Sequence, residues 1–335
     1  MNRKWQTAKQ MITMVSTMGM SRLLVSLGKS EQAMYLVGRR INTPKMKTWA
    51  FAGYEPTEQD VFVATFSKSG TYWTLQITQQ IAYYGLAEFD HIHDLVPWPD
   101  LVMPEIKARL DDSTIAQRAP TGLRIIKTHH QRKYVPFSSA AKYITVIRDP
   151  KEVVVSGYYF CKPILGSFGV TYDLQQWVRA ALRPNEFLFG DWAEHTASWW
   201  AVRNEPNVFV VSYSELKRHA ATIIPQIAEF MGVQLNSEQI DRVIERSSFK
   251  WMKEHKSRFK PPMPPGQTNK PRPLMMRAGQ SGNSSELLSP QQQASIDEFY
   301  RARLKNQFNS DFPYDEIFVT ASTHKTASTP TDKDS

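Results

Sequence analysis

Four consecutive residues, Lys68-Ser69-Gly70-Thr71, carry the groups needed to bind a phosphate or a similar anion. They follow the apolar run Val61–Phe66, which has the length and composition of a strand, and precede apolar residues at helical spacing. N–H groups at the start of a helix lack intrahelical partners, and the helix dipole favours negative charge there. Gly70 allows close backbone approach, Lys68 adds positive charge and the hydroxyls donate hydrogen bonds. The sequence predicts a strand–loop–helix anion site over residues 61–84.

This loop differs from the phosphate-binding loop of common ATPases and kinases. That motif places its lysine directly after the second glycine of Gly-x-x-x-x-Gly, whereas here Lys68 precedes Gly70, and the upstream glycine is missing. A kinase-like phosphoryl transferase is therefore the weaker alternative. The alternative to an anion-binding site is an ordinary turn between a strand and a helix, in which Lys68 has no ligand-binding role.

A second strand, predicted over Leu123–Thr128, is followed by His129 and His130. Open α/β sheets bind ligands just beyond the carboxyl ends of their strands. Histidine is also the natural proton acceptor near neutral pH. Either histidine is a candidate general base, and the alternative is that both make only local hydrogen bonds in a loop.

A third strand is predicted over Tyr143–Arg148, and Asp149-Pro150 suits the start of the next helix. The guanidinium of Arg148, at the strand end, has the fork geometry that binds phosphate. Ser156 lies two turns into the helix and can donate to the same group. The alternative is that Arg148 pairs with Asp149 or with a carbonyl at the sheet edge.

The chain of 335 residues is long enough for one large α/β domain or two small ones, and its 41% hydrophobic and 22% charged side chains are typical of a soluble protein with a substantial core. A single cysteine, Cys161, excludes a disulfide framework or cysteine metal cluster and indicates a reducing compartment. The net charge of +9 suits a small molecule with several phosphates. No nucleic-acid-binding motif is present, so we expect no nucleic-acid partner. His91 and His93 lack partners for a metal site, and we expect them at the surface or lining a pocket.

We divide the chain into a helical extension at 1–44, a catalytic domain at 45–318 and a disordered polar tail at 319–335. Residues 1–30 contain five basic and no acidic side chains, and no apolar run long enough to span a bilayer or resembling a signal peptide. One helical face carries apolar residues, namely Trp5, Ala8, Met11, Ile12, Val15 and Met18. We expect this face to pack on the domain, and the alternative is that the helix lies on an anionic membrane or covers an acceptor site. The expected location is the cytoplasm.

Several segments, taken together, resemble the cytosolic-type sulfotransferases. Thr65–Trp73 resembles their 5′-phosphosulfate-binding loop, and Val146–Ser156 resembles their 3′-phosphate-binding strand and helix. Their catalytic Lys-x-His motif falls on Lys127 and His129.

Later motifs agree in order and spacing. Trp199-Trp200 and Val208–Leu216 match the segment whose tyrosine, here Tyr213, approaches the adenine. Ser247–Met252 matches a nucleotide-contacting segment, and Arg277-Ala278-Gly279 matches the late phosphate-binding loop. The resemblance covers about residues 45–315 and implies a single α/β domain with a central parallel sheet flanked by helices, in a P-loop-like sulfotransferase fold.

Two departures from the family pattern stand out. The late loop has Ala278 where the family has lysine, which puts one phosphate contact in doubt. The family's short dimerisation motif is absent, with Ser289-Pro290 and Ala294 in its place, so the oligomeric state stays open.

The resemblance implies transfer of a sulfuryl group from 3′-phosphoadenosine 5′-phosphosulfate (PAPS) to an acceptor hydroxyl or amine, without a metal. His129 would be the base, with His130 its rival; Lys68 would stabilise the leaving oxygen, and Lys127 would hold the transferring group. The implied donor-binding residues are Lys68, Ser69, Gly70, Thr71, Tyr72, Trp73, Arg148, Ser156, Tyr213, Ser247, Ser248, Phe249, Met252, Arg277, Ala278 and Gly279.

The acceptor is expected to be a hydrophobic small molecule such as an alcohol, phenol, sterol or lipid, because ligand pockets are mostly apolar. Segments 160–190 and 256–273 are candidate lids over its pocket. A glycan acceptor and a nucleotide-binding relative without transfer activity are the alternatives.

Overall fold

The structure is a computed structural model, which describes residues 3–101, 103, 105–263, 272–273, 275, 282 and 284–319, with side chains from residue 12 onward. The predictions for Arg277, Ala278 and Gly279, and for residues 320–335 of the tail, lie outside the described residues.

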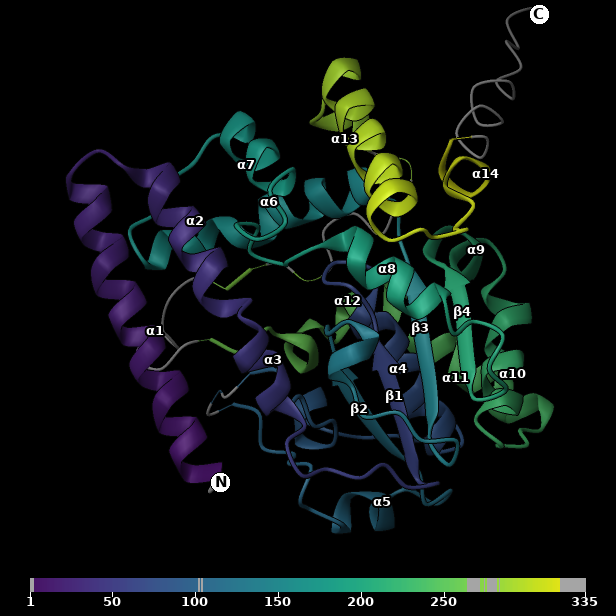
Figure 1. The fold of residues 1–335 in the computed structure, drawn as a ribbon. Helices are drawn as coiled ribbons and strands as arrows, with labels where there is room; N and C mark the ends of the chain where they lie inside the picture. Colours follow the sequence, from purple (N-terminus) through teal and green to yellow (C-terminus); the bar gives the residue numbers. More distant parts are fainter. Residues whose placement is uncertain are drawn as a thin grey trace, which may run out of the picture.

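Four parallel strands form the centre of the fold, in the order β2-β1-β3-β4 (Figure 1). Their bounds are β1 Asp60–Ala64, β2 Arg124–Thr128, β3 Lys142–Ile147 and β4 Val208–Ser212. The first residues of β1 and β2, Asp60 and Arg124, are paired in register and form a buried ion pair with an N–O distance of 2.8 Å. All residues of β1 and β2 are buried, as expected where helices cover both faces of a parallel sheet. The predicted α/β fold with a central parallel sheet is confirmed.

Helices cover both faces of the sheet. On one face, Val61 and Val63 of β1 pack in a cluster with α4 (Thr71–Ala82), α10 (Ala220–Phe230) and α11 (Ser237–Ser247). On the other face, Phe62 and Ala64 join residues of α3 (Pro44–Ala50) and α8 (Trp192–Trp200). This alternation follows from the period of two along a strand.

A third apolar cluster includes Ile147 of β3 and is built mainly from α2 (Ser30–Ile41), α6 (Pro150–Ser167), α7 (Leu174–Ala181), α13 (Pro290–Ala302) and α14 (Tyr314–Phe318). The remaining α-helices are α1 (Arg3–Ser26), α5 (Thr114–Arg118), α9 (Tyr213–Arg218) and α12 (Phe249–Glu254). No helix in the described part of the chain combines the length and apolarity that crossing a membrane requires.

Strand order creates a crevice at the carboxyl edge of the sheet. The chain passes from β1 to β2 on one side, then crosses to β3 on the other side of β1. Loops that leave adjacent strands in opposite directions open the crevice in which α/β proteins bind ligands. Lys68, His129 and Arg148 follow β1, β2 and β3 respectively, so the topology brings three distant segments to one edge.

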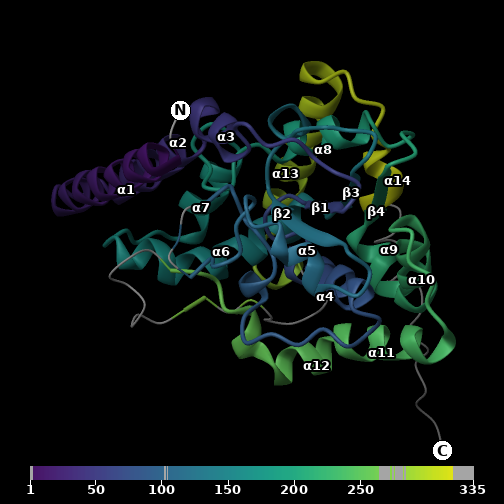
Figure 2. The same cartoon turned by 90° about the horizontal axis from the view of Figure 1, so that it is seen from below.

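The N-terminal helix differs from its prediction. Figures 1 and 2 show α1 along one edge of the molecule beside α2. Thr17 and Ser21 are buried, and Met18 is partly buried. Of the predicted face, Met18 packs against the core, whereas Ile12 and Val15 are 68% and 63% exposed, so the expected packing is confirmed for Met18 and wrong for Ile12 and Val15. The side of α1 that faces the body carries the hydroxyls of Thr17 and Ser21 together with Met18, Leu24 and Val25, which pack against the core.

Candidate active site

The loop between β1 and α4 is a tight turn with an unpaired donor. Lys68 and Gly70 have positive φ angles of 68° and 88°. The hydroxyls of Thr65 and Thr71 lie 2.7 Å apart and close the loop with a hydrogen bond. The hydroxyl of Ser69 is buried and has no hydrogen-bond partner among the described residues. Leaving a buried hydroxyl unpaired costs about 1–3 kcal/mol of stability. A bound anion that accepted a hydrogen bond from Ser69 would remove this cost, so the unpaired hydroxyl is what we expect of an anion-binding residue in the free protein.

Gly70 lies directly against Tyr213. A Cβ atom at position 70 would stand 2.8 and 2.9 Å from two ring carbons of Tyr213, and the φ of 88° is strained for any L side chain. We expect Gly70→Ala to lower the melting temperature and to weaken nucleotide binding by displacing the ring.

The matched control is Gly122→Ala, because Gly122 has a φ of 73° with open space around its Cβ position. Calorimetric titration and thermal unfolding of both variants check the expectation. Equal nucleotide affinity in the two variants would show that the contact with Tyr213 does not matter.

The ammonium of Lys68 is held in apolar surroundings. Its Nζ lies 3.7 Å from the ring centroid of Phe160, and the side chain forms no ion pair with a carboxylate of the described residues. Burial, reinforced by the charge of Arg148, lowers the pKa of Lys68 to about 7. An anion bound beside Lys68 would favour the charged form and raise this pKa again.

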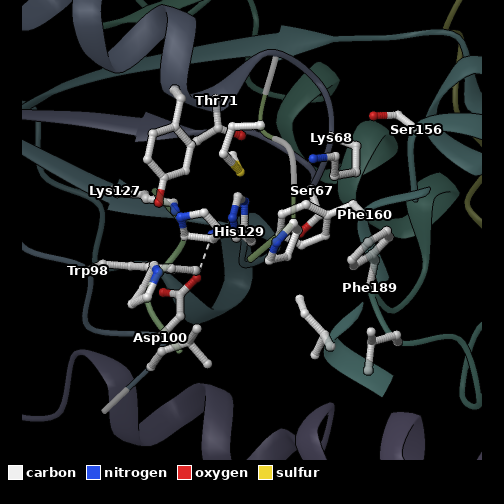
Figure 3. A pocket seen from close by; sticks show the side chains of 18 of the residues that line it. Ser67, Lys68, Thr71, Trp98, Asp100, Lys127, His129, Ser156, Phe160 and Phe189 are labelled. Atoms are coloured by element: carbon white, nitrogen blue, oxygen red, sulfur yellow. Dashed lines mark hydrogen bonds between the residues drawn. The ribbon is translucent and has the colours of Figure 1, made fainter. Parts of the chain in front are cut away.

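Lys127 is fully buried in an aromatic box. Its Nζ lies 3.1 Å from the ring centroid of Trp98 and 4.4 Å from that of Tyr72. Burial lowers the pKa of Lys127 well below its ordinary value, although Asp100 partly opposes the shift. Two lysine side chains thus face the same cavity without carboxylate partners among the described residues, an arrangement that suits a polyanionic ligand, whose charge would favour the protonated form of both (Figure 3).

His129 has a defined tautomer. Its Nδ1 lies 2.8 Å from the carbonyl oxygen of Thr65, and a carbonyl can only accept, so Nδ1 carries the proton and Nε2 is the ring's proton acceptor. The backbone N–H of His129 donates to Asp100 at 2.6 Å (Figure 3). Burial and the neighbouring Lys127 lower the pKa of His129 well below its ordinary value. The ring is therefore neutral near pH 7, as a general base must be.

His130 also lines the cavity, but it is held differently. Its Nε2 is buried without a hydrogen-bond partner among the described residues, at 3.6 Å from Asp100. Its ring packs against Tyr134. Burial lowers the pKa of His130 as well, so protonation state does not separate the two histidines. The difference lies in the bond from His129 to Thr65, which fixes one ring orientation.

Arg148 bridges the segments around the crevice. Its Nε donates to Glu152 at 2.8 Å and its Nη1 donates to the carbonyl of Lys68 at 2.9 Å. The guanidinium also lies 4.4 Å from the ring centroid of Tyr213. The pairing with Asp149, considered from sequence, is replaced by pairing with Glu152, one helical turn further on. Arg148 is thus oriented before any ligand binds.

These groups surround one cavity of about 730 Å³, within the usual size range for small-molecule sites. Of the residues implied by the sequence, those lining it are Lys68, Gly70, Thr71, Tyr72, Trp73, Lys127, His129, Arg148, Ser156, Tyr213, Phe249 and Met252. Ser69, Ser247 and Ser248 are not part of this lining. The hydroxyl of Ser247 donates within its own helix, and that of Ser248 caps α12.

The lining also includes Asp100, which was not predicted from the sequence, and residues of α1, whose covering of an acceptor site was an alternative drawn from the sequence. Asp100 holds His129 and accepts from the hydroxyl of Thr128 at 2.8 Å. Thr13, Met14 and Thr17 bring α1 to the cavity wall. Asp100 has no local sequence signal, because it lies in an irregular segment. Both candidate lid segments contribute lining residues, namely Phe160, Pro163, Ile164, Phe168, Leu188, Phe189, Pro261, Pro262, Met263 and Arg272.

His93 was expected at the surface or lining a pocket, and this expectation is wrong. It is fully buried behind the cavity wall, stacked on Trp98 with ring centroids 5.5 Å apart and hydrogen-bonded to the hydroxyl of Tyr72. It therefore supports the aromatic box around Lys127. No group of three or more histidine, cysteine or carboxylate side chains able to hold a metal occurs among the residues that the structure describes.

Comparison with known proteins gives one consistent result. A family model described as "Sulfotransferase domain" matches residues 58–308. The chain is 31% identical over 266 residues to 3-beta-hydroxysteroid sulfotransferase of Cavia porcellus, covering 77% of this chain and 88% of that protein. A mouse sulfotransferase complexed with PAP has a similar fold, with a TM-score of 0.60 at 20% identity, covering 84% of this chain and 94% of the other. Retinol dehydratase in a complex with retinol and PAP has a TM-score of 0.61 at 18% identity, covering 81% and 88%.

Proposed function

The chain belongs to the sulfotransferase family and is a PAPS-dependent sulfotransferase, and from this premise we propose that it sulfates a hydroxyl of an apolar acceptor, with His129 as general base. The acceptor oxygen attacks the sulfur of PAPS in line with the leaving group. A new S–O bond forms to the acceptor, and the S–O bond to the 5′-phosphate breaks. The acceptor proton passes to Nε2 of His129, and 3′-phosphoadenosine 5′-phosphate (PAP) leaves.

The observation that carries this proposal is the hydrogen bond from Nδ1 of His129 to Thr65. It leaves the neutral ring with its basic nitrogen at Nε2, on a residue that lines the cavity shared with Lys68 and Lys127. A positioned base contributes roughly 10²–10⁴-fold to such a reaction.

Lys68 and Lys127 supply the positive charge that the reaction needs. Sulfuryl transfer, like phosphoryl transfer, depends mainly on positioning and on stabilising charge as it develops. Lys68 stabilises the bridging oxygen as PAP departs, and Lys127 holds the oxygens of the transferring group. Burial lowers the pKa of both lysines in the free protein. The negative charge of the bound donor would raise both pKa values again and so favour the charged forms.

Three further contacts hold the nucleotide. Ser69, with its buried unpaired hydroxyl, and the N–H groups at the start of α4 bind the 5′-phosphate. Arg148, Ser156 and the late-loop Arg277 bind the 3′-phosphate. Trp73 and Tyr213, whose ring centroids lie 5.7 Å apart, offer aromatic surfaces to the adenine.

An apolar acceptor is supported by the lining residues that are not assigned to the nucleotide. They are mainly aliphatic, aromatic and methionine side chains, including Met14, Val37, Ile41, Met46 and Phe189. A Cavia porcellus relative is named for a 3β-hydroxysteroid, which is such an alcohol. The one thiol of the chain, Cys161, is buried and free, which suits action in the reducing cytoplasm.

The test is a transfer assay with sulfur-labelled PAPS, in buffer containing EDTA, against long-chain alcohols, phenols, sterols and sulfatable glycans. We expect label in one or more of the apolar acceptors and no loss of rate with EDTA. Transfer to glycans alone would contradict the acceptor class. PAP binding without transfer to any acceptor would favour a nucleotide-binding relative, and a requirement for magnesium would favour the kinase-like alternative.

A further inference from the structure

Helix α1 has two faces with different surroundings. Toward the body, Thr13, Met14 and Thr17 line the cavity, and Ser21 is buried. Away from the body, large apolar side chains are exposed to solvent. They are Ile12 (68%), Val15 (63%), Met20 (44%), Leu23 (61%) and, just after the helix, Leu27 (62%).

This exposed group, which we call the outer face of α1, is unusual for the molecule. The described residues expose ten large hydrophobic side chains, and five of them lie within the sixteen residues from Ile12 to Leu27. An ordinary surface helix has an apolar side toward the core and a polar side toward solvent, whereas α1 packs Met18, Leu24 and Val25 against the core and is apolar on its solvent side as well. Concentrated exposed apolar surface marks a site of interaction.

The basic side chains of residues 1–30 indicate the chemistry of the partner. Residues 1–30 hold five lysines and arginines and no acidic residue, and both Arg22 and Lys29 are exposed. An apolar helix face flanked only by basic residues is complementary to an anionic lipid surface, to which each nearby lysine or arginine adds attraction. A second copy of the chain is a poor match, because two such helices would bring like charges together.

We propose that the outer face of α1 docks on an anionic lipid surface and that the acceptor reaches the active site from that lipid. The helix would lie in the membrane interface rather than cross the bilayer. The second half of the proposal rests on the function proposed above, since it concerns the acceptor of the same site.

The structure connects the outer face to the cavity over a short distance. A helix is about 10 Å across, and the opposite side of α1 is already part of the cavity wall. Ile41, on the neighbouring α2, is both 39% exposed and a lining residue, so apolar surface continues from the outside to the interior. An alcohol dissolved in the lipid would reach the site without passing through bulk water.

The first test is sedimentation of the full-length protein with vesicles of phosphatidylcholine, alone or mixed with phosphatidylglycerol. We expect binding to the mixed vesicles and little to the neutral ones. The triple variant Ile12→Ser/Leu23→Ser/Leu27→Ser should bind about 100-fold more weakly, because it removes most of the apolar surface that would enter the lipid. The matched control is Leu86→Ser/Val319→Ser, which changes exposed apolar residues elsewhere and should bind like the wild type.

A second readout locates the contact. Cys161 is the only cysteine and is buried, so an environment-sensitive dye can be attached to Leu23→Cys or, as control, to Leu86→Cys. Mixed vesicles should shift the emission to the blue at position 23 and not at position 86. With an apolar alcohol found in the transfer assay, the triple variant should match the wild type in detergent and lose about tenfold or more in vesicles.

Titration with PAP separates the two proposals, because it requires no lipid. If every variant binds PAP and the wild type does not bind mixed vesicles, or binds them as well as the triple variant does, lipid docking is wrong and the catalytic proposal stands. Lipid docking is also wrong if the wild type forms a dimer and does not bind vesicles, while the triple variant is a monomer. If the wild type does not bind PAP, the proposed function itself is contradicted.

Discussion

Replacing His129 by asparagine should lower turnover by roughly 10²–10⁴-fold, which is the contribution of a positioned general base. Asparagine is the informative choice, because its amide N–H can still donate to the carbonyl of Thr65, where Nδ1 donates at 2.8 Å in the wild type. The substitution therefore removes the proton acceptor and leaves the support of the loop. Affinity for PAP should stay within a few-fold, since the leaving nucleotide does not need the base.

His130→Asn is the control for that experiment. His130 lines the same cavity and is similarly buried, so its replacement tests whether any polar change nearby has the same effect. We expect a much smaller loss of turnover. The reverse pattern, with normal turnover in the His129 variant and a large loss in the His130 variant, would transfer the role of base to His130.

Lys68→Ala should lower turnover by about 10²–10³-fold, the range typical of losing one group aimed at developing charge. The reason is that the charge on the bridging oxygen grows during the reaction, so Lys68 stabilises the transition state more than the bound donor. Affinity for PAP, which already carries its full charge, should fall by a smaller factor than turnover with PAPS. Stopped assays with labelled donor and calorimetry with PAP give the two quantities.

Lys162→Ala is the matched control, because Lys162 lies on the same helix as the Phe160 that contacts Lys68 but is exposed and outside the cavity lining. It should leave both quantities near the wild-type values. Lys68→Arg, which keeps the charge but changes its shape, should recover part of the turnover. Equal losses of turnover and affinity in Lys68→Ala would mean that Lys68 binds donor and transition state alike, which contradicts the assigned role.

Much of this site follows from local sequence patterns. Three short apolar runs, each followed by one of Lys68, His129 and Arg148, predict three strands with functional residues just beyond their carboxyl ends. The parallel sheet does place these ends together. The prediction succeeds because each residue is fixed by its position just after a strand. The topology of an open α/β sheet then determines where the three positions meet.

Other features depend on tertiary packing, which leaves little trace in local sequence. Asp100 lies in an irregular segment, yet it holds the backbone of His129. Arg148 selects Glu152 over the adjacent Asp149 because one helical turn brings Glu152 alongside the guanidinium. The burial of Ile12 and Val15 was predicted wrongly, while Met18 of the same predicted face does pack against the core, since helical spacing groups these residues but does not tell which of them face the body.

The most direct test of the account is calorimetric titration of the protein with PAP and, separately, with adenosine 5′-monophosphate, without magnesium. The two ligands differ in the 3′-phosphate, which we propose is bound by Arg148, Ser156 and Arg277. Charged hydrogen bonds contribute about 1.5–3 kcal/mol each, so PAP should bind at least about 100-fold more tightly. Equal binding of the two nucleotides, or binding of neither, would contradict the assignment of the nucleotide site.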